Sequence, residues 1–170
     1  MRSTASVSTL THALDPDLRL QHALDLAYRF LDRRERTVLE VRRYLEDKRV
    51  EPQTIDEALR ELEEQGSLDD AGFAQRFAED KRLLEDWGAD RIARRLAALG
   101  VPAEIVRGTV STRDRDGELA AAFALLARRF PQLDDLPRER RRALGVLVRK
   151  GYEPELAADA IRAHARGEAA

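Results

Sequence analysis

Hydrophobic residues recur along most of this chain at intervals of three or four, which is the spacing of one face of an α-helix. The pattern is clearest in three stretches, 17–31, 70–85 and 116–130. Alternation of apolar and polar residues, the sign of a strand, never continues for long. Ala, Leu, Arg, Glu and Asp dominate the composition, which as a whole favours helix. The sequence therefore predicts an all-α protein.

Three further segments can be laid over one another. Each has an apolar residue, a leucine four positions later and then a proline. These residues are Val41, Leu45 and Pro52, then Ile92, Leu96 and Pro102, then Ala143, Leu147 and Pro154. Proline is tolerated in the first turn of a helix, where its missing N–H would have no partner. Each segment is therefore predicted to form a helix, a tight turn and a second helix.

The tight turns differ in one residue. Gly100 and Gly151 suit the position after a helix where φ is positive, and we interpret them as C-caps. Arg49 occupies the same place in the first segment. Because a residue with a Cβ disfavours positive φ, the first turn is expected to close in a different way.

Together, the long helical stretches and the helix pairs predict three tandem three-helix, helix-turn-helix-like repeats. The boundaries are 17–66, 67–113 and 114–166, and the Ser/Thr-rich, aperiodic residues 1–16 are predicted to be a disordered tail. A period of about fifty residues is typical of a helical-repeat protein. We expect an elongated, curved array whose long surface suits an extended partner. The alternative is one irregular nine-helix domain with coincidental spacing.

Charge is distributed unevenly although the formal net charge is only −2. Basic segments alternate with acidic ones, so differently charged helix faces are expected. We predict that arginines of the basic helices contact an acidic partner or DNA phosphates. They are Arg36, Arg42 and Arg43, then Arg91, Arg94 and Arg95, then Arg138, Arg141 and Arg142. The alternative is that they are solvated and pair with nearby acids, each exposed pair contributing only ~0–1 kcal/mol.

The sequence offers no pattern for catalysis. Its three histidines lie far apart, there is no cysteine, and no glycine-rich phosphate loop or nucleophile elbow is present. We therefore expect no catalytic residues, no cofactor and no metal site. The lack of cysteine fits a reducing cytoplasm, and the N-terminus has no secretory signal pattern. A cytoplasmic monomer is expected.

The stretch GSLDDAGFAQRFAEDK (66–81) contains the paired acids Asp69 and Asp70. A hard cation would need more oxygen ligands than this pair supplies. An aspartate at a helix N-terminus, by contrast, accepts hydrogen bonds from first-turn N–H groups and interacts well with the helix dipole. Asp69 and Asp70 are therefore predicted to cap the helix that opens the second repeat, with Gly66 as the C-cap of the preceding helix.

A second stretch, WGADRIARRLAALGVPAEIV, lies at 87–106. Together with GSLDDAGFAQRFAEDK, it resembles the RecX family of bacterial regulators of the RecA recombinase. RERTVLEVRRYLEDKRV (34–50) is also similar to the family's first repeat, whereas the third repeat matches weakly. Arg49, where a glycine is usual, and Ser67, where an aromatic or aliphatic residue is common, depart from the pattern.

The resemblance implies three tandem three-helix units and a function without enzymatic activity. Members are expected to lie along the groove of the RecA filament on single-stranded DNA and to depress filament growth, ATP hydrolysis, strand exchange and repressor self-cleavage. The expected partner is thus the RecA filament, with weak non-specific DNA contact left open. The alternatives from the residues alone are a helix-turn-helix DNA-binding protein and a general helical-repeat adaptor.

Overall fold

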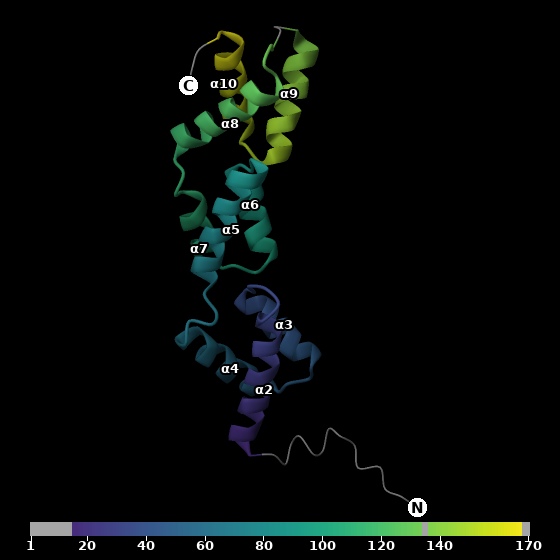
Figure 1. Cartoon of the computed structure of the whole chain (residues 1–170), viewed down its shortest axis with the longest axis vertical. Helices are drawn as coiled ribbons and strands as arrows, with labels where there is room; N and C mark the ends of the chain where they lie inside the picture. Colours follow the sequence, from purple (N-terminus) through teal and green to yellow (C-terminus); the bar gives the residue numbers. More distant parts are fainter. Residues whose placement is uncertain (1–14, 134–135, 168–170) are drawn as a thin grey trace, which may run out of the picture. The chain divides into compact units, whose positions relative to one another are not determined.

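A computed structural model describes residues 15–133 and 136–167, and this part of the chain contains nine α-helices and no strand (Figure 1). The all-α prediction is confirmed. The helices are α2 (Pro16–Leu31), α3 (Val38–Asp47), α4 (Pro52–Glu64), α5 (Asp70–Glu85), α6 (Ala89–Ala98), α7 (Ala103–Val110), α8 (Arg115–Arg129), α9 (Pro137–Lys150) and α10 (Pro154–Ala165). They form three tandem three-helix repeats.

The chain divides into two compact units, the first ending at Phe73 and the second beginning at Ala74. The boundary falls inside α5, so the first turn of that helix belongs to the first unit. Most of the predicted N-terminal tail, residues 1–14, lies outside the described residues. Asp15 accepts a hydrogen bond from the Asp17 N–H (3.2 Å) and Pro16 opens α2, one residue before the predicted start of the first repeat at 17.

The core of the first unit is built from the apolar faces of α2, α3 and α4. Its buried residues are Ala23, Leu24, Ala27, Val41, Leu45, Ile55, Ala58, Leu59, Leu62 and Leu68. Fully burying a side chain the size of Leu, Ile or Val stabilises the fold by about 1.5–3 kcal/mol.

The second unit repeats the same core positions twice. Ile92 and Leu96 of α6 are fully buried, as are Ala143 and Leu147 of α9, and they correspond to Val41 and Leu45 of α3. In the third repeat they pack with residues of α8 and α10 into one hydrophobic cluster. The apolar residue and the leucine that defined the repeat in the sequence are thus core positions in all three repeats.

All three tight turns close in the same way. The N–H of Val50, Val101 or Tyr152 donates to the carbonyl of Leu45, Leu96 or Leu147, each at 3.1 Å. The residue before it has positive φ, +86° at Gly100, +94° at Gly151 and +60° at Arg49. The expectation of a different first turn is therefore wrong, because this hydrogen bond holds Arg49 in the left-handed conformation despite its Cβ. Pro102 is the N-cap of α7, whereas Pro52 and Pro154 begin their helices.

The paired acids of the GSLDD stretch cap two different helices. Asp69 accepts a hydrogen bond from the Gly72 N–H (2.9 Å) in the first turn of its own helix, α5. Asp70 instead accepts from the Val38 N–H (3.0 Å) at the start of α3. Burial raises the pKa of the Asp70 carboxyl, the Val38 N–H opposes this shift, and the charges of Asp69 and Glu40 add to it. Gly66 ends the preceding turn with φ +70°.

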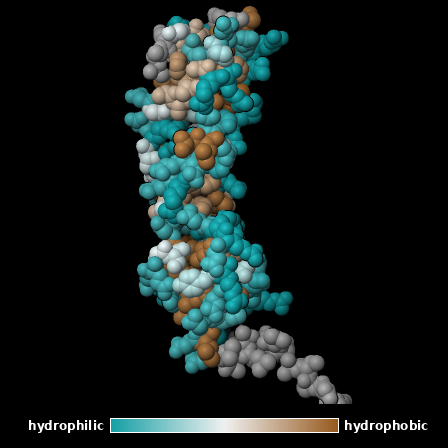
Figure 2. Space-filling view, in the orientation of Figure 1, coloured by the Kyte–Doolittle hydropathy of each residue, from teal (hydrophilic) through white to brown (hydrophobic). Residues whose placement is uncertain are grey.

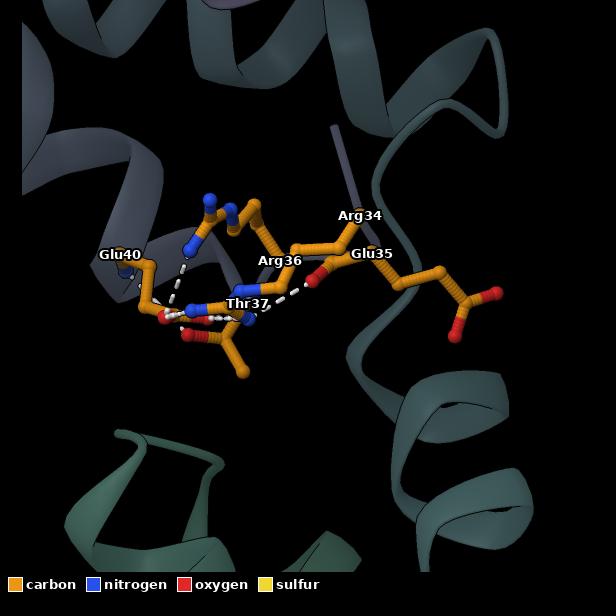
Figure 3. A network of polar contacts seen from close by, with 5 residues as sticks. All are labelled: Arg34, Glu35, Arg36, Thr37 and Glu40. Carbon is orange, nitrogen blue, oxygen red and sulfur yellow. Dashed lines mark hydrogen bonds and ion pairs between the residues drawn. The ribbon is translucent and has the colours of Figure 1, made fainter. Parts of the chain in front are cut away.

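The start of α3 carries a polar network, drawn in Figure 3. The buried Thr37 hydroxyl accepts from the Glu40 N–H (3.2 Å) and the Glu40 carboxylate accepts from the Thr37 N–H (3.1 Å), which makes a capping box. Arg34 and Arg36 both form ion pairs with Glu40. Burial alone would raise the pKa of the Glu40 carboxyl, but hydrogen bonds from Arg34 and Thr37 and the charges of both arginines lower it.

Hydrophilic residues predominate on the face drawn in Figure 2, where hydrophobic residues form separate patches. Leu83 and Leu84 of α5 are the most exposed large hydrophobic residues (81% and 74%). Among the described residues, no helix combines the length and the apolar character that crossing a membrane requires.

Candidate functional site

The second unit contains an open groove formed by α5, α6 and the C-terminal end of α9, with a volume of about 610 Å³. Its lining is unusually basic. It consists of Phe77, Lys81, Trp87, Arg91, Arg94, Arg95, Ala98 and Arg149. The structure thus gathers the three arginines predicted on α6 into one surface and adds Lys81 and Arg149 to them.

Two aromatic rings line this basic groove. Phe77 and Trp87 meet edge to face, with their ring centroids 6.1 Å apart. The Arg91 guanidinium carbon lies 4.1 Å from the Trp87 ring centroid, and the Lys81 ammonium lies 5.1 Å from it. Cation–π attraction therefore holds two of the groove cations in place, and these contacts occupy the indole ring.

Hydrogen bonds to backbone carbonyls orient two of the groove arginines. The Arg91 Nη1 donates to the Arg149 carbonyl (3.0 Å), and the Arg94 Nε donates to the Asp90 carbonyl (3.2 Å). Beside the groove, Glu85 forms an ion pair with Lys81, and the hydrogen bond from Lys81 lowers the pKa of the Glu85 carboxyl. The lining itself thus carries five cations and no carboxylate.

The groove is suited to binding an anion. Guanidinium groups bind carboxylates and phosphates through paired hydrogen bonds, which an ammonium group cannot match. None of the described lining residues carries a carboxylate, hydroxyl, thiol or imidazole. In the described part of the chain, no three His, Asp or Glu side chains come together as they would around a metal ion.

The predicted arginines of the first unit are largely engaged with neighbouring residues. Arg36 is mostly buried, lies over the Phe30 ring (4.2 Å) and pairs with Glu40 (3.6 Å). Arg42 pairs with Asp56 (2.7 Å). Arg43 is exposed. The structure therefore places Arg36 in the cap of α3, where it supports the fold.

The predicted arginines of the third repeat are exposed near the start of α9, away from the end of that helix that lines the groove. Arg141 borders a small hollow of 240 Å³ together with Ile161, and Arg142 lies over the Phe130 ring (5.9 Å). Arg138, Arg141 and Arg142 stay a prediction, separate from the groove.

Sequence reasoning missed Lys81, Trp87 and Arg149 as groove residues. Lys81 follows Phe77 by one helical turn, and this spacing could have placed the two on one face. Arg149 is 58 residues from Arg91, whose side chain contacts its carbonyl. No local pattern reveals that contact, because it depends on the end of α9 meeting the start of α6.

The comparisons with known proteins agree with one another. The family models "RecX, first three-helix domain" and "RecX, second three-helix domain" match residues 23–62 and 69–109. A regulatory protein RecX of Deinococcus radiodurans is 33% identical over 139 residues, which are 82% of this chain and 66% of that protein. One from Amycolatopsis mediterranei is 28% identical over 90% of this chain and 89% of its own length.

Solved structures show the same fold. A crystal structure of RecX from Lactobacillus salivarius superposes with a TM-score of 0.77 over 87% of this chain and 97% of that chain, at 18% identity. A second crystal structure, of a regulatory protein RecX, gives a TM-score of 0.71 over 92% of this chain and 78% of that one, at 17% identity.

Three tandem three-helix repeats define a helical-repeat protein, and the second and third of them carry the basic groove. The matches to the models of both three-helix domains identify the family within this class. The chain belongs to the RecX family of regulatory proteins.

Proposed function

We propose that this protein is a non-enzymatic negative regulator of the RecA recombinase. It binds in the groove of the RecA filament on single-stranded DNA and inhibits filament growth, ATP hydrolysis, strand exchange and co-protease activity. Family membership supports the partner. The single observation that supports a contact surface for this partner is the basic lining of the groove, with Lys81, Arg91, Arg94, Arg95 and Arg149.

The charges of the groove explain how a protein with net charge −2 binds an anionic filament. The surplus of positive charge is local, and three arginines of the groove, Arg94, Arg95 and Arg149, are exposed. Attraction by such a surface speeds encounter with an acidic protein face or with DNA phosphates and weakens as salt screens it. Because cations already occupy the Trp87 ring, the groove favours contact with charged groups over stacking of bases.

The test is RecA-catalysed ATP hydrolysis on single-stranded DNA with substoichiometric amounts of this protein. The wild type should lower the rate. Arg94→Glu with Arg95→Glu should raise the concentration needed for half inhibition by about tenfold or more, since two attractive charges become repulsive. Helical content by circular dichroism should stay unchanged, because both side chains are exposed.

Arg60→Glu with Arg107→Glu is the matched control. It makes the same change in net charge at two exposed positions that do not line the groove, and it should inhibit like the wild type. Equal inhibition by the groove variant and the wild type would remove the groove from the contact surface. A wild type without effect on hydrolysis, but with salt-sensitive binding to duplex DNA alone, would favour a DNA-binding protein.

A further inference from the structure

Helix α6, which carries the groove arginines, has no side-chain cap of its own. Gly88 is its N-cap residue. The Gly88 N–H donates to the Lys150 carbonyl (2.9 Å), and the Asp90 N–H donates to the Gly151 carbonyl (3.0 Å). The Ala89 N–H between them donates to the Glu118 carboxylate (3.2 Å). Three of the four N–H groups that a helix start leaves unpaired are thus satisfied by the third repeat.

The C-terminal end of α9 is completed by the same contacts. The carbonyls of Leu147 and Val148 accept hydrogen bonds from its own turn. The next three carbonyls, of Arg149, Lys150 and Gly151, accept from Arg91 Nη1, the Gly88 N–H and the Asp90 N–H. The negative end of one helix dipole therefore meets the positive end of another. We call this contact the α9–α6 joint, and Figure 1 shows the two helix ends meeting.

Two glycines allow the α9–α6 joint to form. A Cβ on Gly88 would lie 2.5 Å from the Gly151 carbonyl oxygen, and a Cβ on Gly151 would lie 2.3 Å from the Cβ of Arg91. Neither contact can be relieved by turning a flexible side chain, since the nearest atoms are backbone or Cβ. Gly151 also has φ +94°.

The hydrogen bond that Glu118 accepts has a counterpart in the first unit. Ala89 is the first residue of α6 and is capped by a carboxylate on α8, while Val38 is the first residue of α3 and is capped by Asp70 on α5 (3.0 Å). In both cases the carboxylate comes from the first helix of the following repeat. At the corresponding position of α9 stands Pro137, which has no N–H to be capped.

We infer that the third repeat is a positioning element of the basic groove. The α9–α6 joint and Glu118 fix the start of α6, and with it Arg91, Arg94 and Arg95, while α9 itself contributes Arg149 to the lining. The inference rests on the proposed function for its link to partner binding. The family models end at residue 109, so the groove depends on a part of the chain that neither model covers.

The experiment compares Gly88→Ala with Gly108→Ala in the full chain. Gly108 is a helical glycine of the same unit, and a Cβ there meets no atom within 4 Å. Trp87, the single tryptophan, lies next to Gly88 and is 8% exposed, so its fluorescence reports on the joint. Gly88→Ala should shift the emission to longer wavelength and weaken inhibition of RecA about tenfold, whereas Gly108→Ala should change neither.

Glu118 provides a second comparison that does not depend on a steric clash. Glu118→Ala removes the acceptor of the Ala89 N–H, and Glu118→Gln keeps one. We expect about tenfold faster hydrogen exchange at Ala89 and weaker inhibition in the alanine variant, with most of both restored by glutamine. If Glu118 served only to stabilise the fold, the inhibition of RecA across the two variants would not parallel the hydrogen exchange of the Ala89 amide.

The outcomes separate this inference from the proposed function. Unchanged Trp87 emission in Gly88→Ala, or unchanged Ala89 exchange in Glu118→Ala, would overturn the inference. Changed emission and exchange with full inhibition of RecA would also overturn it, because the groove would then not need the joint. If the wild type fails to inhibit RecA, the proposed function fails, while the two spectroscopic results still decide the joint.

Discussion

Arg49 shows how one residue is held in an unfavourable backbone conformation by the turn around it. Its φ of +60° matches that of the glycines in the other two turns, and its N–H donates to the Glu46 carbonyl (2.8 Å). A left-handed conformation costs a residue with a Cβ about 1–2 kcal/mol. The hydrogen bonds of the turn and the burial of Leu45 offset this cost.

Arg49→Gly should therefore stabilise the first unit. Relief of the left-handed strain exceeds the roughly 0.5–1 kcal/mol that a glycine loses in chain entropy, which leaves a gain of about 0.5–1 kcal/mol. Urea unfolding followed by circular dichroism measures the change. Lys48→Gly is the control, because Lys48 has φ −80° and glycine there should only destabilise. A loss of stability in Arg49→Gly would show that the Arg49 side chain contributes more to stability than its left-handed backbone conformation costs.

Glu40 makes the stability of the first unit depend on pH. Its pKa is lower in the folded protein than the ordinary 4.5, so the unfolded chain binds more protons in the acid range. The stabilisation is fully present above pH 4.5 and is lost as the pH falls through the lowered pKa.

Glu40→Gln should remove this dependence. At neutral pH it should cost about 1 kcal/mol of unfolding free energy, and its curve should converge with the wild-type curve at low pH. Unfolding in urea at a series of pH values measures both. Glu46→Gln, an exposed position on the same helix, should run parallel to the wild type. If the Glu40→Gln curve ran parallel to the wild-type curve, the charge of Glu40 in the network of Figure 3 would contribute nothing to the free energy of unfolding.

At the scale of elements, helix ends in this protein are completed by other helices as well as by their own residues. Asp69 caps its own helix, a role that the sequence predicts. Asp70 caps α3, 32 residues earlier in the chain, and a local reading of the sequence does not predict this. The pattern of two adjacent acids specifies where a helix starts, but only packing specifies which N–H each carboxylate reaches.

Substitutions of Asp70 can therefore distinguish what its hydrogen-bond acceptor contributes to stability from what its charge contributes. Asp70→Ala should cost about 1 kcal/mol, because the Val38 N–H loses its partner. Asp70→Asn should be as stable as the wild type or more so at neutral pH, since the raised pKa shows that the charged form is disfavoured in the folded state. The advantage of asparagine should grow as the pH rises through the pKa of Asp70.

Thermal unfolding of both Asp70 variants at pH 4 and pH 7 tests this expectation. Asp47→Ala, at an exposed aspartate of the same unit, should match the wild type at both values. If asparagine were as destabilising as alanine, the carboxylate charge itself would be needed at the start of α3.

For the whole molecule, the periodic features were predictable and the contacts between repeats were not. The three-helix repeats follow from positions such as Leu45, Leu96 and Leu147, which occur at a fixed spacing and are fully buried. The role of Glu118 has no such signal, because its partner Ala89 lies 29 residues away and donates through its backbone. The contact of α6 arginines with a partner stays a prediction.

The α9–α6 joint also bears on the order in which the protein can be completed during synthesis. Arg91 emerges from the ribosome 58 residues before Arg149, whose carbonyl its side chain contacts. At 5–20 residues per second, this is a wait of roughly 3–12 s. Over that interval the start of α6 lacks its partners at the end of α9, whereas the first unit, with α2, α3 and α4 already made, can close its own core. The basic groove is thus among the last features of the chain to form.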